Sequence, residues 1–93
     1  MVISGFDWDD QNVLHIERHQ FSPEEVEEVL DSRFKVRRAR EGLYIALGET
    51  LDGRLAFVVF RRLSKGVIRV VTARDVVTAR DMESGERRLF RRK

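Results

Sequence analysis

Two histidines spaced four residues apart are the side chains best suited to proton transfer in this sequence. His15 and His19 share helical spacing with Asn12 and Ile16, so both rings are predicted to reach one groove. The ordinary pKa of an imidazole, about 6.5, suits acid–base catalysis. A ring that only packs beside Ile16 and forms a hydrogen bond is an equally good interpretation. Zinc helices use the same spacing, but Ile16 stands where they carry glutamate, so a zinc-dependent hydrolase is a minor alternative.

Cutting RNA without a metal needs a group that accepts the 2′-hydroxyl proton, cations that hold the charge on phosphorus, and an acid for the leaving oxygen. Arginine suits the second task because its planar fork matches two phosphate oxygens. The candidates are Arg69, Arg74, Arg80, Arg87 and Arg88. Glu86 is the candidate carboxylate base, and Trp8 and Tyr44 are candidates for stacking on RNA bases. Alternatively, about half of the arginines pair with acids such as Asp75 and Asp81, and Trp8 anchors the core.

Charge is distributed unevenly along the chain. Residues 1–32 hold nine acids and one arginine, a net −8, whereas residues 33–60 have a net +3 and residues 61–93 a net +7. A basic face of this kind attracts phosphate groups, although a solvated surface with internal ion pairs explains it equally well. The pattern predicts RNA binding by the C-terminal two thirds.

Two helices are predicted in the acidic segment. The first begins at Asp9 or Asp10, after a short apolar strand that contains Phe6 and Trp8. The second has Ser22 as its N-cap, followed by Pro23 at the first helical position and by Glu25, which completes a capping box. Its buried face is formed by Val26, Val29 and Leu30.

Alternation of apolar and polar residues predicts a β-meander after the helices. The four predicted strands contain Phe34 and Val36, residues 43–47, residues 55–60 and residues 67–71. Glu41-Gly42, Asp52-Gly53 and residues 64–66 are the predicted turns, and residues 82–93 are predicted to end in a short helix.

The hexapeptide Val-Val-Thr-Ala-Arg-Asp occurs twice, at residues 70–75 and 76–81. In a strand, an insertion of six residues keeps every side chain on its original face, whereas in a helix it rotates the register by roughly 240°. The repeat is therefore predicted to lengthen a strand or to form a loop.

Length and composition favour one α+β domain over residues 1–93. With no cysteine there is no disulfide framework and no thiolate metal site. No apolar run reaches the roughly 20 residues of a membrane span, and the N-terminus lacks the basic start of a signal peptide, so the cytoplasm is the expected compartment.

Several short segments together resemble the BrnT family of toxins. The segments that carry the resemblance are residues 6–9 (FDWD), 12–19 (NVLHIERH), 22–26 (SPEEV), 44–48 (YIALG), 52–55 (DGRL), 67–74 (VIRVVTAR) and 86–88 (ERR). Each string is short, but their order and spacing extend over nearly the whole chain. The duplicated hexapeptide departs from the family pattern, so either Arg74 or Arg80 takes the position of the family's arginine.

The resemblance implies a metal-independent endoribonuclease toxin of a bacterial type II toxin–antitoxin system that cleaves messenger RNA, with His19 the better candidate of the two histidines. It implies a compact RelE-like α+β fold with two N-terminal helices, a four-stranded mainly antiparallel sheet and a short C-terminal helix. It also implies no cofactor, and a BrnA-like antitoxin with a DNA-binding ribbon-helix-helix domain that assembles with the toxin into a heterotetramer. The alternative function is a non-catalytic RNA-binding or adaptor domain, which would bind RNA in a salt-sensitive way without cleaving it.

Overall fold

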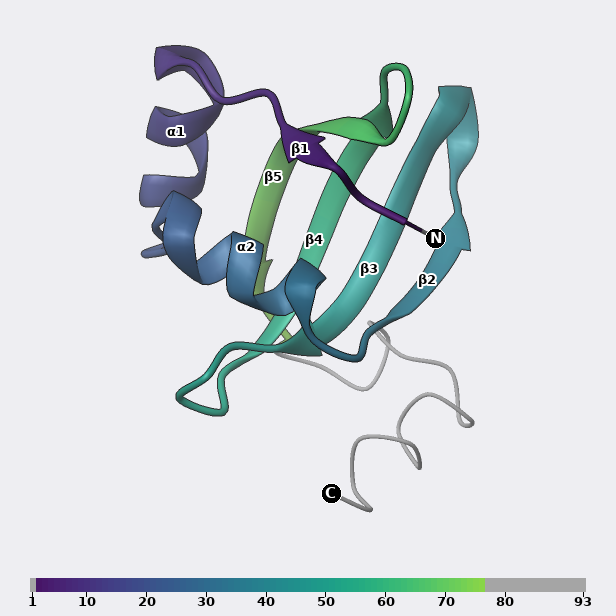
Figure 1. Cartoon of the computed structure of the whole chain (residues 1–93). Coiled ribbons are helices and arrows are strands. Elements are labelled where there is room, and N and C mark those ends of the chain that lie inside the picture. Colours follow the sequence, from purple (N-terminus) through teal and green to yellow (C-terminus); the bar gives the residue numbers. More distant parts are fainter. Residues whose placement is uncertain (1, 77–93) are drawn as a thin grey trace.

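The computed structural model describes residues 2–76, which form one five-stranded sheet with two helices on one face (Figure 1). The spatial order of the strands is β1-β5-β4-β3-β2. The elements are β1 (Gly5–Phe6), α1 (Asp10–Glu17), α2 (Pro23–Asp31), β2 (Lys35–Arg38), the 3₁₀ turn η1 (Arg40–Gly42), β3 (Leu43–Glu49), β4 (Leu55–Arg62) and β5 (Val67–Asp75). The predicted helix at residues 82–93 lies outside the described residues, and neither described α-helix is long and apolar enough to cross a membrane.

Helix α2 begins where the sequence predicts. The Ser22 hydroxyl accepts a hydrogen bond from the Glu25 amide at 3.1 Å, and the Glu25 carboxylate accepts one from the Ser22 amide at 3.0 Å. Val26, Val29 and Leu30 are buried against the sheet, which confirms the predicted apolar face.

Helix α1 is fixed to the sheet by a buried amide. Asp9 caps the helix, and the Asn12 side chain accepts a hydrogen bond from the Asp9 amide at 2.8 Å. The Asn12 Nδ2 group donates to the carbonyl oxygens of Asp7 at 2.9 Å and Val70 at 3.0 Å. Since Asn12 is only 2% exposed, its side chain satisfies backbone groups that water cannot reach. One residue thus joins the start of α1 to the middle of β5.

The predicted count of four strands is wrong, because β1 adds a fifth. Gly5 and Phe6 pair in parallel with Val67 and Ile68 of β5, whereas the other three strand pairs are antiparallel. The sequence marked Phe6 only as part of a short apolar strand, and two residues carry too little alternation to show whether they join the sheet.

The core lies between the helices and one face of the sheet. Phe21 and Ile16 bring the helical segment into contact with buried residues of the three central strands. The fully buried side chains on β3, β4 and β5 that form this core are Ala46, Ala56, Val58, Phe60, Ile68, Val70 and Ala73. On the opposite face, Leu47 packs with Leu55 and Phe57 in a smaller cluster.

A β-bulge in β5 changes which side chains face the core. Phe60 pairs with Val70 while Val59 pairs with Thr72, so Val71 is an extra residue on β5. Because of this insertion, Val70 and Ala73 both face the core although they are three positions apart, an offset that places side chains of a regular strand on opposite faces. Arg74, which an unbroken strand would direct into the core with Val70, instead lies over Phe57 on the opposite face.

The first copy of the hexapeptide repeat, residues 70–75, forms the C-terminal part of β5, in agreement with the predicted strand. Val76, the first residue of the second copy, follows the strand, and its amide donates to the Leu55 carbonyl at 3.1 Å. Residues 77–81 lie outside the described residues.

Replacement of Asn12 by alanine is expected to destabilise the fold by about 2–3 kcal/mol, because it leaves buried carbonyl groups of Asp7 and Val70 without a donor. Urea unfolding followed by circular dichroism measures this change. Gln11→Ala, on the exposed side of α1, is the matched control. A loss for Asn12→Ala no larger than that of the control would contradict the assigned role.

Candidate functional site

His19 lies in a shallow pocket of about 290 Å³ at the junction of the helical layer and the end of β5. Arg18, Gln20, Arg74 and Asp75 line the rest of this histidine pocket. An imidazole from the N-terminal segment and a guanidinium from the late strand therefore share one concavity.

Helix α1 ends earlier than the predicted stripe requires. Its last residue is Glu17, and His19 follows in a turn in which its amide donates to the Ile16 carbonyl at 2.9 Å. The rings of His15 and His19 still lie close, with centroids 6.0 Å apart. Of the two histidines, only His19 lines the pocket.

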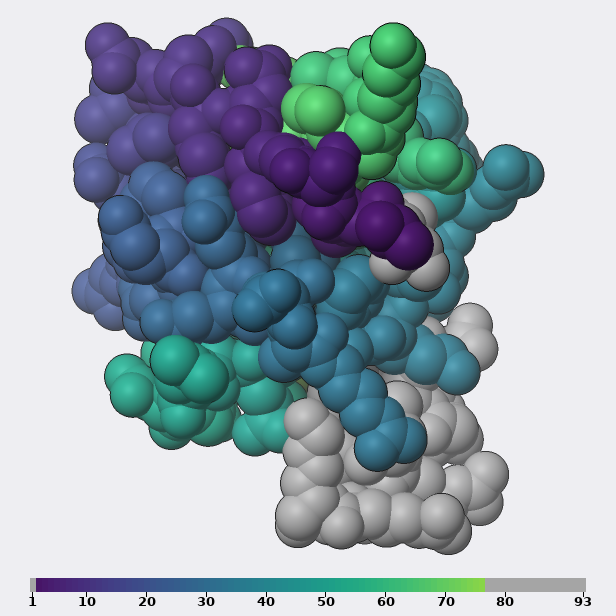
Figure 2. Space-filling view, in the orientation of Figure 1, coloured from purple at the N-terminus to yellow at the C-terminus, as the bar shows by residue number. Residues whose placement is uncertain are grey.

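Arg54 joins the elements that form the histidine pocket. Its Nη1 atom donates to the Gln20 carbonyl at 2.8 Å and to the Glu25 carboxylate at 3.1 Å, and its Nε and Nη2 atoms donate to Asp75 at 3.2 and 3.0 Å. The guanidinium carbon lies 3.8 Å from the centre of the buried Phe21 ring. Arg54 follows the β3–β4 turn, which packs directly beneath α2 (Figure 2).

These contacts explain the unusual backbone beside His19. Gln20 has a φ of 64°, in the left-handed region that non-glycine residues rarely adopt. Its carbonyl is held by Arg54, and the next residue, Phe21, is inserted into the core. The turn that carries His19 is therefore held in place at the end that leads into α2.

Arg74 is also held by contacts of its own. Its guanidinium carbon lies 4.2 Å from the centre of the Phe57 ring, and Nη1 donates to the Asp75 carbonyl at 3.2 Å. Stacking of this kind orients a guanidinium group without removing its charge. In the pocket, this group can stabilise an anion while His19 transfers a proton.

Two other predicted residues have structural partners elsewhere. Arg69 donates to Asp7 at 3.1 Å and to Asp9 at 3.0 Å, which ties β5 to the start of α1. Hydrogen bonding by Arg69, together with the Asn12 amide, lowers the pKa of Asp9 below its usual value of 3.8. Trp8 donates from Nε1 to Glu27 at 2.7 Å and stacks on Phe6, as in the core-anchor interpretation.

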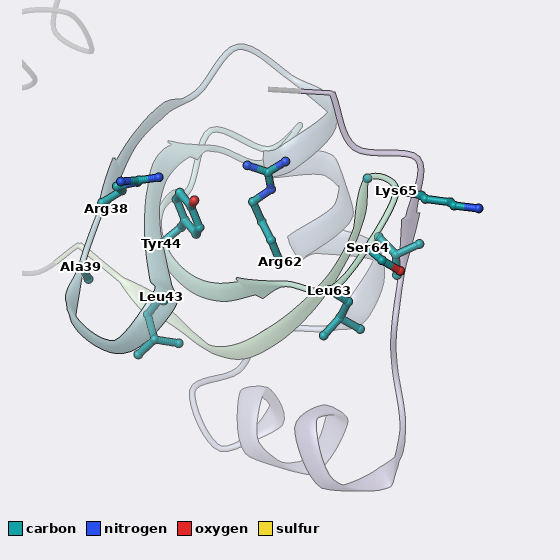
Figure 3. A pocket seen from close by; sticks show the side chains of 11 residues that line it. Arg38, Ala39, Leu43, Tyr44, Arg62, Leu63, Ser64 and Lys65 are labelled. Carbon is teal, nitrogen blue, oxygen red and sulfur yellow. The ribbon is translucent and has the colours of Figure 1, made fainter.

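Tyr44 lies at the other end of the sheet, in a larger cleft of about 640 Å³ (Figure 3). This tyrosine cleft opens between the β2–β3 turn and the β4–β5 turn. The guanidinium groups of Arg62 and Arg38 stabilise the phenolate form of Tyr44 and so lower its pKa below the usual value of 10.0. The tyrosine cleft does not include either histidine.

Four of the predicted site residues, Arg80, Glu86, Arg87 and Arg88, lie outside the described residues. Sequence reasoning did not single out Arg54, Arg38 or Arg62. Arg38 and Arg62 stand at strand ends beside predicted turns, a position that could have marked them as neighbours of one sheet edge. Nothing in the local sequence marks Arg54, because its partners come from three separate segments.

Metal binding has no support in the part of the chain that the structure describes. Within residues 2–76, no three histidine, aspartate or glutamate side chains are grouped so that they could hold a metal ion.

The chain is similar to proteins of known family. A family model described as ribonuclease toxin, BrnT, of type II toxin–antitoxin system matches residues 8–86. The 1.1 Å crystal structure of the Brucella abortus ribonuclease toxin BrnT superposes with a TM-score of 0.65 at 19% sequence identity, and the match covers 80% of this chain and 97% of that chain. At this identity the structural likeness shows the fold alone. No curated protein matches the chain.

Replacement of Arg54 by lysine is expected to destabilise the protein by about 2 kcal/mol, because an ammonium group cannot replace the several directed hydrogen bonds of the guanidinium fork. Urea unfolding gives the stability, and the NMR signals of the His19 ring report whether the turn has moved. Arg33→Lys, at an exposed position before β2, is the control. Unchanged His19 signals in Arg54→Lys would show that Arg54 does not position the pocket.

Replacement of Arg69 by glutamine is expected to raise the pKa of Asp9, since Arg69 is the largest cause that lowers it. A carboxyl whose folded-state pKa is depressed contributes stability above the unfolded pKa of 3.8 and loses that contribution as the pH falls through the folded value. The variant should therefore show a weaker loss of stability below pH 3.8. Carbon NMR titration of the Asp9 carboxyl tests the shift, with Arg61→Gln as control. Equal midpoints in both variants would refute it.

Proposed function

This chain belongs to the BrnT family of ribonuclease toxins of type II toxin–antitoxin systems, and on that premise we propose that it is a metal-independent endoribonuclease that cleaves messenger RNA and arrests growth. The observation that carries the proposal to particular residues is the convergence of His19 and Arg74 on one pocket. Each residue comes from a separate segment, and together they supply two of the three groups that RNA cleavage needs.

In the proposed reaction, the His19 imidazole accepts the proton of the 2′-hydroxyl as its oxygen attacks the neighbouring phosphorus. The bond from phosphorus to the 5′-oxygen then breaks, and an acid donates a proton to that leaving oxygen. Arg74 stabilises the additional negative charge on the phosphate oxygens during this step. Glu86, the candidate carboxylate base, stays an alternative to His19 as the group that accepts the 2′-hydroxyl proton.

The position of Arg74 also bears on the ambiguity that the repeat creates. The bulge at Val71 directs Arg74 out of the core, and Arg74 reaches the pocket that holds His19. This supports Arg74 as the family arginine. Arg80, in the second copy, stays an alternative.

The biological setting follows from the family. A type II toxin acts beside a protein antitoxin, and we propose that the partner is BrnA-like, with a ribbon-helix-helix domain that binds DNA, and that the two proteins assemble into a heterotetramer in the cytoplasm. Likeness to the RelE group of messenger-RNA endonucleases is likewise a proposal. The basic charge of residues 33–93 is consistent with an RNA substrate.

Cleavage assays test the proposed function directly. Purified protein should cut a labelled messenger RNA in the presence of EDTA, and His19→Asn and Arg74→Gln should each slow cleavage by about 10²–10⁴-fold, the usual contribution of an acid–base or charge-stabilising group. His15→Asn, outside the pocket, should retain activity within a few-fold.

Each negative outcome of these assays rejects a different part of the proposed function. If the unaltered protein binds RNA in a salt-dependent manner but gives no products, the alternative of a non-catalytic RNA-binding or adaptor domain is correct. If cleavage persists in His19→Asn, the protein is a ribonuclease but its base lies elsewhere. Cleavage that EDTA abolishes would reject metal independence.

A further inference from the structure

We propose that the tyrosine cleft is a second RNA-binding site, separate from the histidine pocket, in which Arg38, Arg62 and the Tyr44 hydroxyl hold one phosphate group of the RNA chain. This inference rests on the proposed function, since it takes RNA as the substrate. It adds a binding site to that function and makes no change to the catalytic residues.

The cleft has the size and the walls of a built site. At about 640 Å³, it falls within the range of ligand pockets, roughly 300–1,000 Å³. The β2–β3 turn forms one wall, and the β4–β5 turn forms the other. Tyr44 lies between them on β3, and its ring stacks on the buried Phe60 with centroids 5.6 Å apart.

Both walls are held by contacts with other elements. Arg61 donates to the Glu41 carbonyl at 3.0 Å, which ties the β2–β3 turn to β4. Ser4 donates from its hydroxyl to the Lys65 carbonyl at 2.7 Å and from its amide to the Gly66 carbonyl at 2.9 Å, which ties the β4–β5 turn to the N-terminal segment. A side chain at residue 66 would collide with Ser4, because a Cβ there would lie 2.7 Å from its hydroxyl oxygen. The cleft is therefore formed before any ligand arrives.

The charged side chains among the described residues that line the cleft are all positive. The guanidinium groups of Arg38 and Arg62 lie on opposite sides of Tyr44 (Figure 3), and none of the described residues that line the cleft is acidic. The lining is Arg38, Ala39, Gly42, Leu43, Tyr44, Arg62, Leu63, Ser64, Lys65, Gly66 and Val67. Arg54 and Arg69, in contrast, each have two carboxylate partners. Two like charges held close together are destabilising until an anion lies between them.

The lowered pKa of Tyr44 reflects the positive potential of the cleft. Arg62 and then Arg38 stabilise its phenolate, which lowers its pKa. An anion placed between the two guanidinium groups would accept hydrogen bonds from them, and the phenol hydroxyl would then donate to the anion.

A phosphate group fits this arrangement better than a carboxylate or a base alone. Two guanidinium forks and a hydroxyl offer several donors around one point, which suits a tetrahedral anion with several acceptor oxygens. Lys65 extends away from Tyr44 (Figure 3), so it contributes long-range attraction at the rim of the cleft.

The two sites are far enough apart to act independently. Val67 lines the tyrosine cleft and Arg74 lines the histidine pocket, and they stand at opposite ends of β5. At a rise of about 3.3 Å per residue, the separation is roughly 20 Å. A single nucleotide cannot occupy both, so the cleft holds a part of the RNA away from the bond that is cut.

Binding of a 2′-O-methyl oligoribonucleotide tests the inference without cleavage, because the attacking hydroxyl is blocked. Fluorescence anisotropy at low salt should show binding weakened about 10-fold in Arg38→Gln and in Arg62→Gln, and each should lower the salt dependence of log K by about one unit. The matched control is Arg33→Gln, an exposed arginine outside the cleft, which should change affinity less than about two-fold. Equal effects of all three changes would overturn the inference.

The single tyrosine of the chain provides a second readout. In protein carrying ¹³Cζ-labelled tyrosine, the oligonucleotide should raise the pKa of Tyr44, because the bound phosphate offsets the two guanidinium charges. Inorganic phosphate forms the second arm. A shift of the Tyr44 pKa with inorganic phosphate but not with the oligonucleotide would show a site for free anions. No shift in either arm would show that no anion enters the cleft. Both results overturn the inference.

Failure of this inference can be distinguished from failure of the proposed function. His19→Asn should slow cleavage by about 10²–10⁴-fold yet bind the oligonucleotide normally. If the unaltered protein cuts RNA while Arg38→Gln and Arg62→Gln bind like Arg33→Gln, only the second site is rejected. If no RNA is cut but these two changes weaken binding, the cleft stands and the catalytic proposal falls.

Discussion

The contacts of Arg54 are the constraint on which the arrangement of the histidine pocket depends. One guanidinium group reaches the α1–α2 turn, the first turn of α2 and the last residue of β5, and it stacks on a core phenylalanine. These contacts connect the turn that carries His19 to the end of β5, so Arg54 constrains the distance between His19 and Arg74. Arg54 follows a surface turn that is far from His19 in sequence, so a residue with no proposed chemical role can hold together two segments of the pocket.

A single inserted residue has an equally large effect at β5. Strand side chains alternate, so an odd insertion exchanges the two faces for everything that follows. Before the bulge, Ile68 and Val70 face the core; after it, Ala73 does, and Arg74 is directed away. Burial of a guanidinium without a partner would be very unfavourable, so the bulge reconciles a charged strand end with an apolar core.

The sequence predicted most of the fold because its local signals agree with the tertiary contacts. The Ser22 capping box, the apolar face of α2 and the four antiparallel strands have signals within a few residues. The parallel strand β1 was missed as a sheet member because its partner lies about sixty residues away in sequence. The candidate site was only partly predictable for the same reason: His19 and Arg74 carry chemistry in their residue types, whereas Arg54, Arg38 and Arg62 become important only through neighbours that folding brings together.

The duplicated hexapeptide repeats the part of β5 that contains Arg74. Since residues 70–75 and 76–81 are identical, loss of either copy produces the same shorter protein, in which every position from Val70 to Asp75 has the residue found there now. Contraction of the repeat would therefore leave the residues of β5, including the bulge and Arg74, unaltered. The change in the described residues would fall on Val76, which packs against Leu47 and would be replaced by Met82.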